Sequence, residues 1–235
     1  MYINPEYFIV DFLRNRLTDP RTSRRPTLTS DSFTATASQT EFSLSPTTGK
    51  SLQHVSSVDV EGDVKIKWKD YYIDPRDEKI IFFSGVTLNE NVEVNYYEGT
   101  TNWIYWDKIT KTLSSTSFPR IDVLTITGPG KRLGNYEAPV ENAILFQIDV
   151  WTKEKSDAQL FTIDSKKYTG ENLAKYLAFE VMQNFEDNED DLHPALYDYT
   201  PTNAIPGTMP FDEDYQCHHK IVEFIMRGIK IGRIS

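Results

Sequence analysis

Apolar residues near the beginning of the chain recur at the spacing of an α-helix. Between residues 4 and 17 they fall on one face, and polar residues fall on the other. Asn4 and Pro5 suit the first positions of a helix, and Thr18-Asp19-Pro20 is typical of its end. The pattern therefore predicts an amphipathic helix over residues 4–17 and an exposed polar linker over residues 21–30.

Between residues 33 and 97 the apolar residues change to the period of two that is typical of β-strands. Turn signals such as Glu61-Gly62-Asp63 and Asp74-Pro75-Arg76 separate the apolar runs. Over residues 64–69 every second residue is apolar and the others are lysines. About six short strands separated by turns are typical of a small β-sandwich or barrel.

The remainder of the chain mixes both periods, with strands predicted over residues 121–126, 144–151 and 220–231 and a helix over residues 171–185. A lone helix such as 4–17 is marginal in water, so we expect it to pack on the sheet that contains residues 144–151. We therefore predict an α+β fold with two domains. A helix plus antiparallel sheet unit, residues 1–30 and 102–235, is interrupted by an all-β sandwich or barrel insert, residues 31–101.

The charge and composition of the chain argue against several classes of protein. The net charge of −10 argues against a general nucleic-acid binder, because such proteins neutralise phosphates with Lys and Arg. Apolar runs stay far below the roughly 20 residues of a membrane span, and the first residues are not typical of a signal peptide. Cys217 is the only cysteine, which excludes an internal disulfide. We expect a protein with no membrane segment.

Three stretches suggest chemistry at first sight. Gly128-Pro129-Gly130-Lys131 departs from a phosphate-binding loop, because Leu133 follows Arg132, and we interpret it as a hairpin loop. In Cys217-His218-His219 the two adjacent histidines of a strand point to opposite faces, which disfavours a shared metal ion. The acidic run 186–191 lacks the order of a calcium loop. With no catalytic constellation recognisable, we predict no enzyme activity, no cofactor and no metal site.

Arginine is concentrated near the beginning of the chain. Arg14, Arg16, Arg21, Arg24 and Arg25 form either a solvated helix face and linker or a surface that docks onto an acidic neighbour or DNA, since Arg makes bidentate contacts to carboxylates and phosphates. We predict the following partner-binding residues: Arg14, Arg21, Arg24, Arg25, Lys131 and Arg132.

Several strand segments resemble a small β module of virion proteins in tailed bacteriophages. These segments are FTATASQTEFSL (33–44), VDVEGD (58–63), YYID (71–74), IIFFSGV (80–86) and VEVNYY (92–97). The resemblance covers about 65 residues, and that module occurs in tail, neck and fibre proteins. It implies a structural protein of the virion.

The rest of the chain resembles tail-terminator, or tail-completion, proteins. NPEYFIVDFLRNRLTDP (4–20) is similar to their opening helix, FPRIDVLTI (118–126) and AILFQIDVWTK (143–153) to their strands, and the helix from Glu171 to their crossing helix. The β insert departs from the compact form of that family.

The resemblance implies a structural subunit at the neck of a virus, assembled in the host cytoplasm. A homo-oligomeric ring, usually a hexamer, would cap the tail tube protein and receive the head-connector and neck proteins. DNA would pass through its lumen without specific binding, and the family has no catalytic motif. The alternative is a β-rich receptor-binding or carbohydrate-binding module of a tail fibre or baseplate. Such a module would stack its ligand on Trp103, Tyr105 and Trp106.

Overall fold

The computed structural model describes residues 5–75, 77–106, 118–127, 131–132, 140–153, 161–163, 165–188, 198–201, 207–208 and 217–229. The predictions made for Asn4, for the loop 128–130 and for residues 189–191 of the acidic run lie outside these ranges. The described residues form mainly antiparallel β-sheets with two α-helices, which confirms the broad α+β class.

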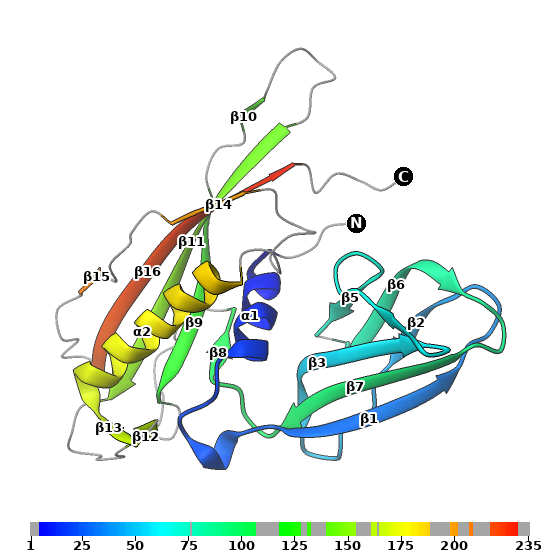
Figure 1. Ribbon diagram of the computed structural model, residues 1–235, viewed down its shortest axis with the longest axis horizontal. Helices are drawn as coiled ribbons and strands as arrows, with labels where there is room; N and C mark the ends of the chain where they lie inside the picture. Colours follow the sequence, from blue (N-terminus) through cyan, green and yellow to red (C-terminus); the bar gives the residue numbers. More distant parts are fainter. Residues whose placement is uncertain are drawn as a thin grey trace. The chain divides into compact units, whose positions relative to one another are not determined.

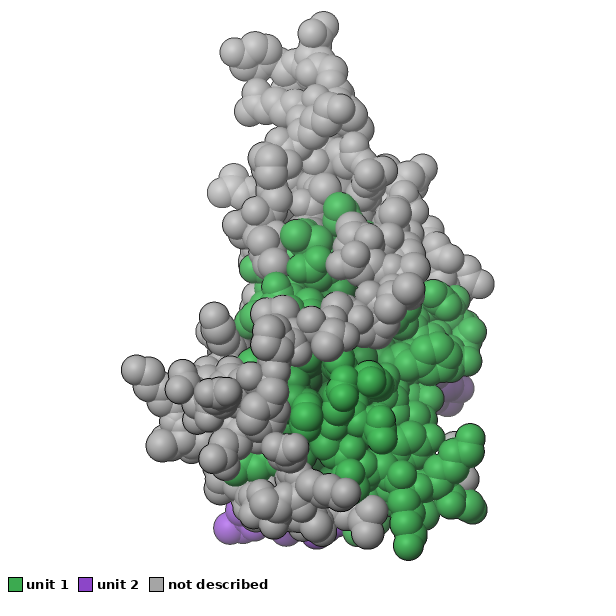
Figure 2. All heavy atoms as spheres, turned by 90° about the vertical axis from the view of Figure 1, so that its left-hand side faces the viewer, with its two compact units in different colours: residues 1–22, 103–235 green, residues 23–102 purple. Residues whose placement is uncertain are grey.

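The chain divides into two compact units (Figure 2). Unit 1 consists of residues 1–22 and 103–235, and unit 2 consists of residues 23–102. The first boundary therefore lies eight residues before the boundary predicted at residue 31. The boundary lies earlier because the first strand of unit 2 already begins at Thr27 and pairs along its whole length with the last strand of that unit.

Unit 1 combines two helices with a seven-stranded sheet of order β14-β16-β11-β9-β8, to which β10 and β15 are added at β11 and β16. Its elements are α1 (Pro5–Arg16), β8 (Ile104–Tyr105), β9 (Arg120–Thr127), β10 (Lys131–Arg132), β11 (Val140–Lys153), β12 (Phe161–Ile163), β13 (Lys166–Tyr168), α2 (Gly170–Asp187), β14 (Asp198–Pro201), β15 (Gly207–Thr208) and β16 (Cys217–Ile229). Both predicted helices and the three predicted strands are confirmed, although most of these elements extend beyond the predicted bounds.

The two helices cover the same face of this sheet (Figure 1). Helix α2 lies along β16 and β11, and α1 lies on β8 and β9, which confirms the predicted packing of the first helix. The strands meet the helices with apolar side chains, and Phe185 of α2 contacts Phe224 of β16 at a ring distance of 4.5 Å. Helix α2 is stabilised mainly by this burial, because its apolar stripe faces the sheet along its length.

Unit 2 contains two sheets, a four-stranded sheet of order β1-β7-β3-β4 and a three-stranded sheet of order β2-β6-β5. Its strands are β1 (Thr27–Thr34), β2 (Gln39–Ser43), β3 (Ser51–Val60), β4 (Asp63–Lys65), β5 (Tyr71–Asp74), β6 (Lys79–Val86) and β7 (Asn91–Gly99), preceded by the short helix η1 (Thr22–Arg24). Phe33 of β1 and Phe42 of β2 contact each other between the sheets, with their ring centres 5.5 Å apart.

Two predictions for unit 2 are wrong. Residues 21–30 are not a linker throughout, because β1 begins at Thr27. The strand predicted over residues 64–69 ends at Lys65, and its apolar residues Val64 and Ile66 are exposed at 66% and 50%. The hairpin turn explains the exposure of Val64, since it pairs Asp63 with Val60 and Lys65 with Val58, which are buried, and so places Val64 on the opposite face of the strand.

The segment 47–50 is held onto β7 by the buried carboxylate of Glu98. This carboxylate accepts hydrogen bonds from the Thr47 backbone N–H at 2.7 Å, the Thr47 hydroxyl at 2.8 Å and the Lys50 ammonium at 2.9 Å. The backbone N–H of Thr47, followed by Lys50, lowers the pKa of Glu98 to about 2. The folded unit therefore stabilises the ionised form of Glu98 over the protonated form.

We predict that a Glu98→Gln variant is less stable than the wild type at pH 7 and that the difference becomes small near pH 2. The folded pKa of Glu98 lies below its value in the unfolded chain, which is about 4.3. The stabilisation is thus complete above that value and disappears as the pH falls through the folded pKa. Urea unfolding of both proteins between pH 7 and 2 measures the difference. A stability difference independent of pH would contradict this role of the ionised carboxylate.

We also predict that residues 23–102 fold when expressed alone, with cooperative unfolding and a β-sheet circular dichroism spectrum. The matched control is a fragment of residues 35–102, which lacks β1 and exposes the edge of β7 along eight paired positions. This shorter fragment should aggregate or unfold without a cooperative transition. Cooperative unfolding of the control with an equal midpoint would show that β1 contributes little to unit 2.

Candidate functional site

A cavity of about 440 Å³ opens in unit 2 beside the second half of β6. Between the paired positions of β2 and β6, one residue of β2 faces four residues of β6, so Phe82–Gly85 bulges out of the ladder. Gly85 is required in this bulge, because a Cβ there would lie 2.8 Å from the Cα of Ser38. The bulge leaves space between β6 and the hairpin of β3 and β4.

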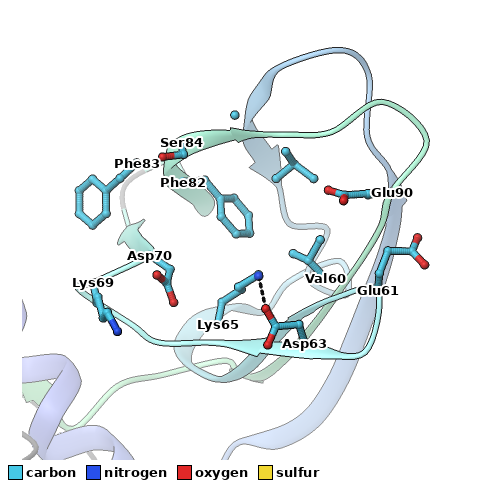
Figure 3. A pocket seen from close by; sticks show the side chains of 12 residues that line it. Val60, Glu61, Asp63, Lys65, Lys69, Asp70, Phe82, Phe83, Ser84 and Glu90 are labelled. Carbon is cyan, nitrogen blue, oxygen red and sulfur yellow. Dashed lines mark hydrogen bonds and ion pairs between the residues drawn. The ribbon is translucent and has the colours of Figure 1, made fainter.

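The floor of the cavity is apolar and its walls are charged (Figure 3). Val60, Phe82 and Val86 are three of its apolar lining residues, here called the floor, and are each only 6% exposed. The charged lining residues come from the hairpin, from the turn after β4 and from the residue that precedes β7: Glu61, Asp63, Lys65, Lys69, Asp70 and Glu90. Four carboxylates against two ammonium groups leave the cavity with a net charge of −2.

Hydrogen bonds from backbone N–H groups fix three of these carboxylates in place. Glu61 accepts from the N–H of Asn91, Glu90 accepts from that of Thr87 at 2.9 Å, and Asp70 accepts from that of Ile66 at 2.8 Å. Each bond uses one oxygen of the carboxylate. The side chains are thus positioned before any ligand arrives, which reduces the entropy lost on binding.

Lys65 places its ammonium group inside this ring of carboxylates, where it pairs with Asp63. The hydrogen bond to Asp63 is the main cause of a raised pKa for Lys65, and the charges of Asp63, Asp70 and Glu90 act in the same direction against desolvation. An exposed pair of this kind stabilises the fold only slightly. Its significance is chemical, because it shows a cationic group held within the cavity.

A second group of charged residues is buried in unit 1, on the sheet face away from the helices. The Arg120 guanidinium binds Asp122 and lies 3.8 Å from the ring centre of Tyr105. Asp122 lies directly opposite Asp149 in the register of β9 and β11, and two carboxylates so close repel each other unless cations compensate. Arg120 supplies one such cation to Asp122 from the same strand.

His219 faces the same carboxylates from β16. Its Nε2 atom lies 3.0 Å from Oδ1 of Asp149, without the angles of a hydrogen bond. Its imidazole stacks on Trp151 with the ring centres 3.7 Å apart. Gln147 also donates to Asp149 at 2.8 Å. Since these groups are mostly buried and bind one another, we interpret this charged group as structural.

The predicted partner-binding arginines lie in different environments. Arg14 is only 7% exposed, and its guanidinium donates to the backbone carbonyl of Ile104 at 2.6 Å. It therefore belongs to the core of unit 1, which differs from both sequence-based interpretations, a solvated face and a docking surface. Arg21 is half-buried and donates to the carbonyl of Phe118 at 2.7 Å.

The other predicted contact residues do not form one site within the described structure. Arg24 is buried at the end of η1, and Arg25 is exposed. Lys131 and Arg132 form β10, whose side chains lie outside the described part of the chain. The prediction of a contact surface at these positions stays a prediction.

The aromatic residues proposed for ligand stacking have contacts within unit 1. Trp103 is 7% exposed, the Tyr105 ring lies under Arg120, and Trp106 meets Tyr7 at a ring distance of 5.6 Å. The cavity in unit 2 is not predicted by the pattern of the sequence. The charged residues of the run Glu61–Lys65 are the part of the sequence that could have indicated it. Whether they face the cavity depends on the register of the hairpin, which the sequence does not show.

Within the described ranges, no three His, Cys, Asp or Glu side chains gather where a metal ion could be held. No helix in the same residues has both the length and the apolar character to cross a membrane. No protein-family model, curated protein or solved structure matches this chain.

Proposed function

We propose that this chain is a structural virion protein of a tailed bacteriophage, a tail-terminator or neck subunit. It forms a ring at the junction of head and tail, caps the tail tube and receives the head connector. It turns over no substrate, and DNA passes through the lumen of the ring without specific binding. The net charge of −10 suits such a lumen, because an acidic wall does not retain DNA.

The observation that carries the proposal is the arrangement of unit 1. Its longest elements are, in chain order, the helix α1, the strands β9 and β11, the helix α2 and the strand β16, and α1 and α2 lie on the same sheet face. A helix, a sheet and a crossing helix are what the resemblance to tail-terminator proteins implies.

Exposed apolar side chains in both units favour an assembly protein. Leu28 on the edge strand β1 is 57% exposed, and Phe179 on the outer face of α2 is 56% exposed. Among the described strands β1 pairs only with β7, so its other edge is open for β-augmentation by a neighbouring subunit. When each subunit uses one surface to bind a different surface of the next, the subunits form a closed ring if the rotation between neighbours divides a full turn evenly.

The proposal is tested by deleting the gene from the virus and imaging the particles by electron microscopy. Separate heads and tails, or tail tubes of irregular length, are the expected result. Native mass spectrometry and cryo-electron microscopy of the purified protein should show a closed ring. If the deletion gave complete virions that fail only at host attachment, the neck assignment would be wrong and a receptor-binding module of a fibre would replace it.

We further predict that an Arg25→Glu variant assembles more slowly onto purified tails than the wild type. Arg25 is exposed, so its reversal places a negative charge where an acidic neighbour would approach. The difference should shrink as salt screens the charges. Lys166→Glu, with the same change of charge at an exposed position of β13, is the control. Equal assembly rates for all three proteins would exclude Arg25 from the contact.

A further inference from the structure

The cavity of unit 2 already accommodates one aliphatic cation, which is the side chain of Lys65. Its ammonium pairs with Asp63, and in Figure 3 it faces the ring of Phe82 and the side chain of Val60. Lys65 is half-buried although β4 is an edge strand with open solvent beside it. The cavity is therefore compatible with a cationic head group on an apolar stem.

Lys65 does not neutralise the cavity. With both lysines counted, the lining retains a net charge of −2. Glu61 and Glu90 each use one carboxylate oxygen to accept a backbone N–H, and the described residues give the other oxygen no hydrogen bond. Carboxylates concentrated in a partly enclosed site attract cations and repel anions.

The apolar floor favours an organic cation over an inorganic one. An inorganic ion gains nothing from contact with Val60, Phe82 and Val86, whereas an alkyl stem buries apolar area against them. The Phe82 ring adds an attraction for an ammonium or guanidinium group near its face. A neutral sugar would meet the same floor but would leave the negative charge without compensation. A volume of about 440 Å³ falls in the size range of small-ligand sites.

We propose that this cavity binds an aliphatic organic cation, an alkylammonium or alkylguanidinium group. The stem lies on Val60, Phe82 and Val86, and the head group lies between the carboxylates of Glu61, Asp63 and Glu90. The same chemistry is presented by a free amine and by a Lys or Arg side chain of another protein. The site does not depend on the proposed role in the virion neck.

The test is calorimetric titration of the complete chain with four probes. Butylammonium and the peptide acetyl-Gly-Arg-Gly-amide carry the proposed group, methyl glucoside is the neutral probe, and Mg²⁺ is the inorganic one. We expect saturable binding of the first two and none of the last two. Peptide binding tenfold tighter than amine binding identifies a protein side chain as the source, and similar binding of the two identifies a free amine.

Two variants with opposite effects locate the binding. A Glu61→Gln, Glu90→Gln double variant should weaken binding of the amine by about tenfold or more, because two charges near the head group are removed. Each Gln keeps an oxygen for the backbone N–H it accepts, so the fold is preserved. Lys65→Met should strengthen binding several-fold, because it removes the competing cation and releases Asp63. Glu186→Gln, at an exposed position of α2, is the control.

Unchanged affinity in both cavity variants, with unfolding midpoints equal to wild type, would overturn the proposal. So would the absence of saturable amine binding to the wild type at low salt. Binding of methyl glucoside in preference to the amine would also overturn it, and it would assign the cavity to a carbohydrate instead.

Discussion

Replacing Phe12 by Asp is expected to destabilise unit 1 by about 4 kcal/mol, enough to unfold a domain of ordinary stability. Phe12 is only 5% exposed, and its ring stacks on that of Phe185 with the centres 5.0 Å apart. A carboxylate there removes the contact between α1 and α2 and is itself desolvated. Urea unfolding followed by circular dichroism measures the change.

The matched control is Phe179→Asp, which makes the same substitution on the exposed face of α2. Because Phe179 is 56% exposed, its replacement should change stability by no more than about 0.5 kcal/mol. The transition of unit 2 should be the same in both variants. A Phe12→Asp protein as stable as the wild type would show that α1 is detached from the sheet in solution, as an arm to a neighbouring subunit would be.

Replacing Arg120 by Met is expected to cost about 3 kcal/mol, the second largest effect that we predict. The substitution removes the cation that binds Asp122 and leaves that carboxylate buried opposite Asp149. Removing one partner of a buried ion pair lowers stability far more than replacing both partners by apolar residues, because the remaining charge stays buried without an opposite charge. The measurement is again the free energy of unfolding of unit 1.

A double variant, Arg120→Met with Asp122→Leu, should recover part of the lost stability. It removes the carboxylate together with its cation, and only Asp149 of the facing carboxylates then remains. Lys166→Met controls for the loss of an exposed cation and should have little effect. If the double variant were less stable than Arg120→Met alone, Asp122 would have a stabilising role that does not depend on Arg120.

The helices and the long strands could be predicted from the sequence because their signals are local. The apolar stripe of residues 4–17, with Pro5 near its start, became α1, and the alternation over residues 144–151 became part of β11. Such periodicity reports directly which positions are buried. The start of β1 could not be found in this way, since its exposed and half-exposed residues carry no apolar alternation.

The cavity and the buried charges depend on register, which a single segment does not specify. Val64 and Lys65 exchange faces if the hairpin turn moves by one residue, and only the pairing of Asp63 with Val60 decides between the two. Likewise Asp122 and Asp149 are ordinary strand residues until the sheet places them opposite each other. The bulge at Phe82–Gly85 has no periodic signal at all, and it creates the space of the cavity.

The pairing of β1 with β7 also has a consequence for the order of folding. The contact of Arg14 with Ile104 joins two parts of unit 1 that are 90 residues apart. Closing a loop of that length in an unfolded chain costs conformational entropy and slows folding. Thr27 and Glu98 are, however, direct partners in unit 2. Once unit 2 has folded, this pairing shortens the loop between Arg14 and Ile104 from 90 residues to about 20. We therefore expect unit 2 to fold first, and the assembly of unit 1 to become a short-range search.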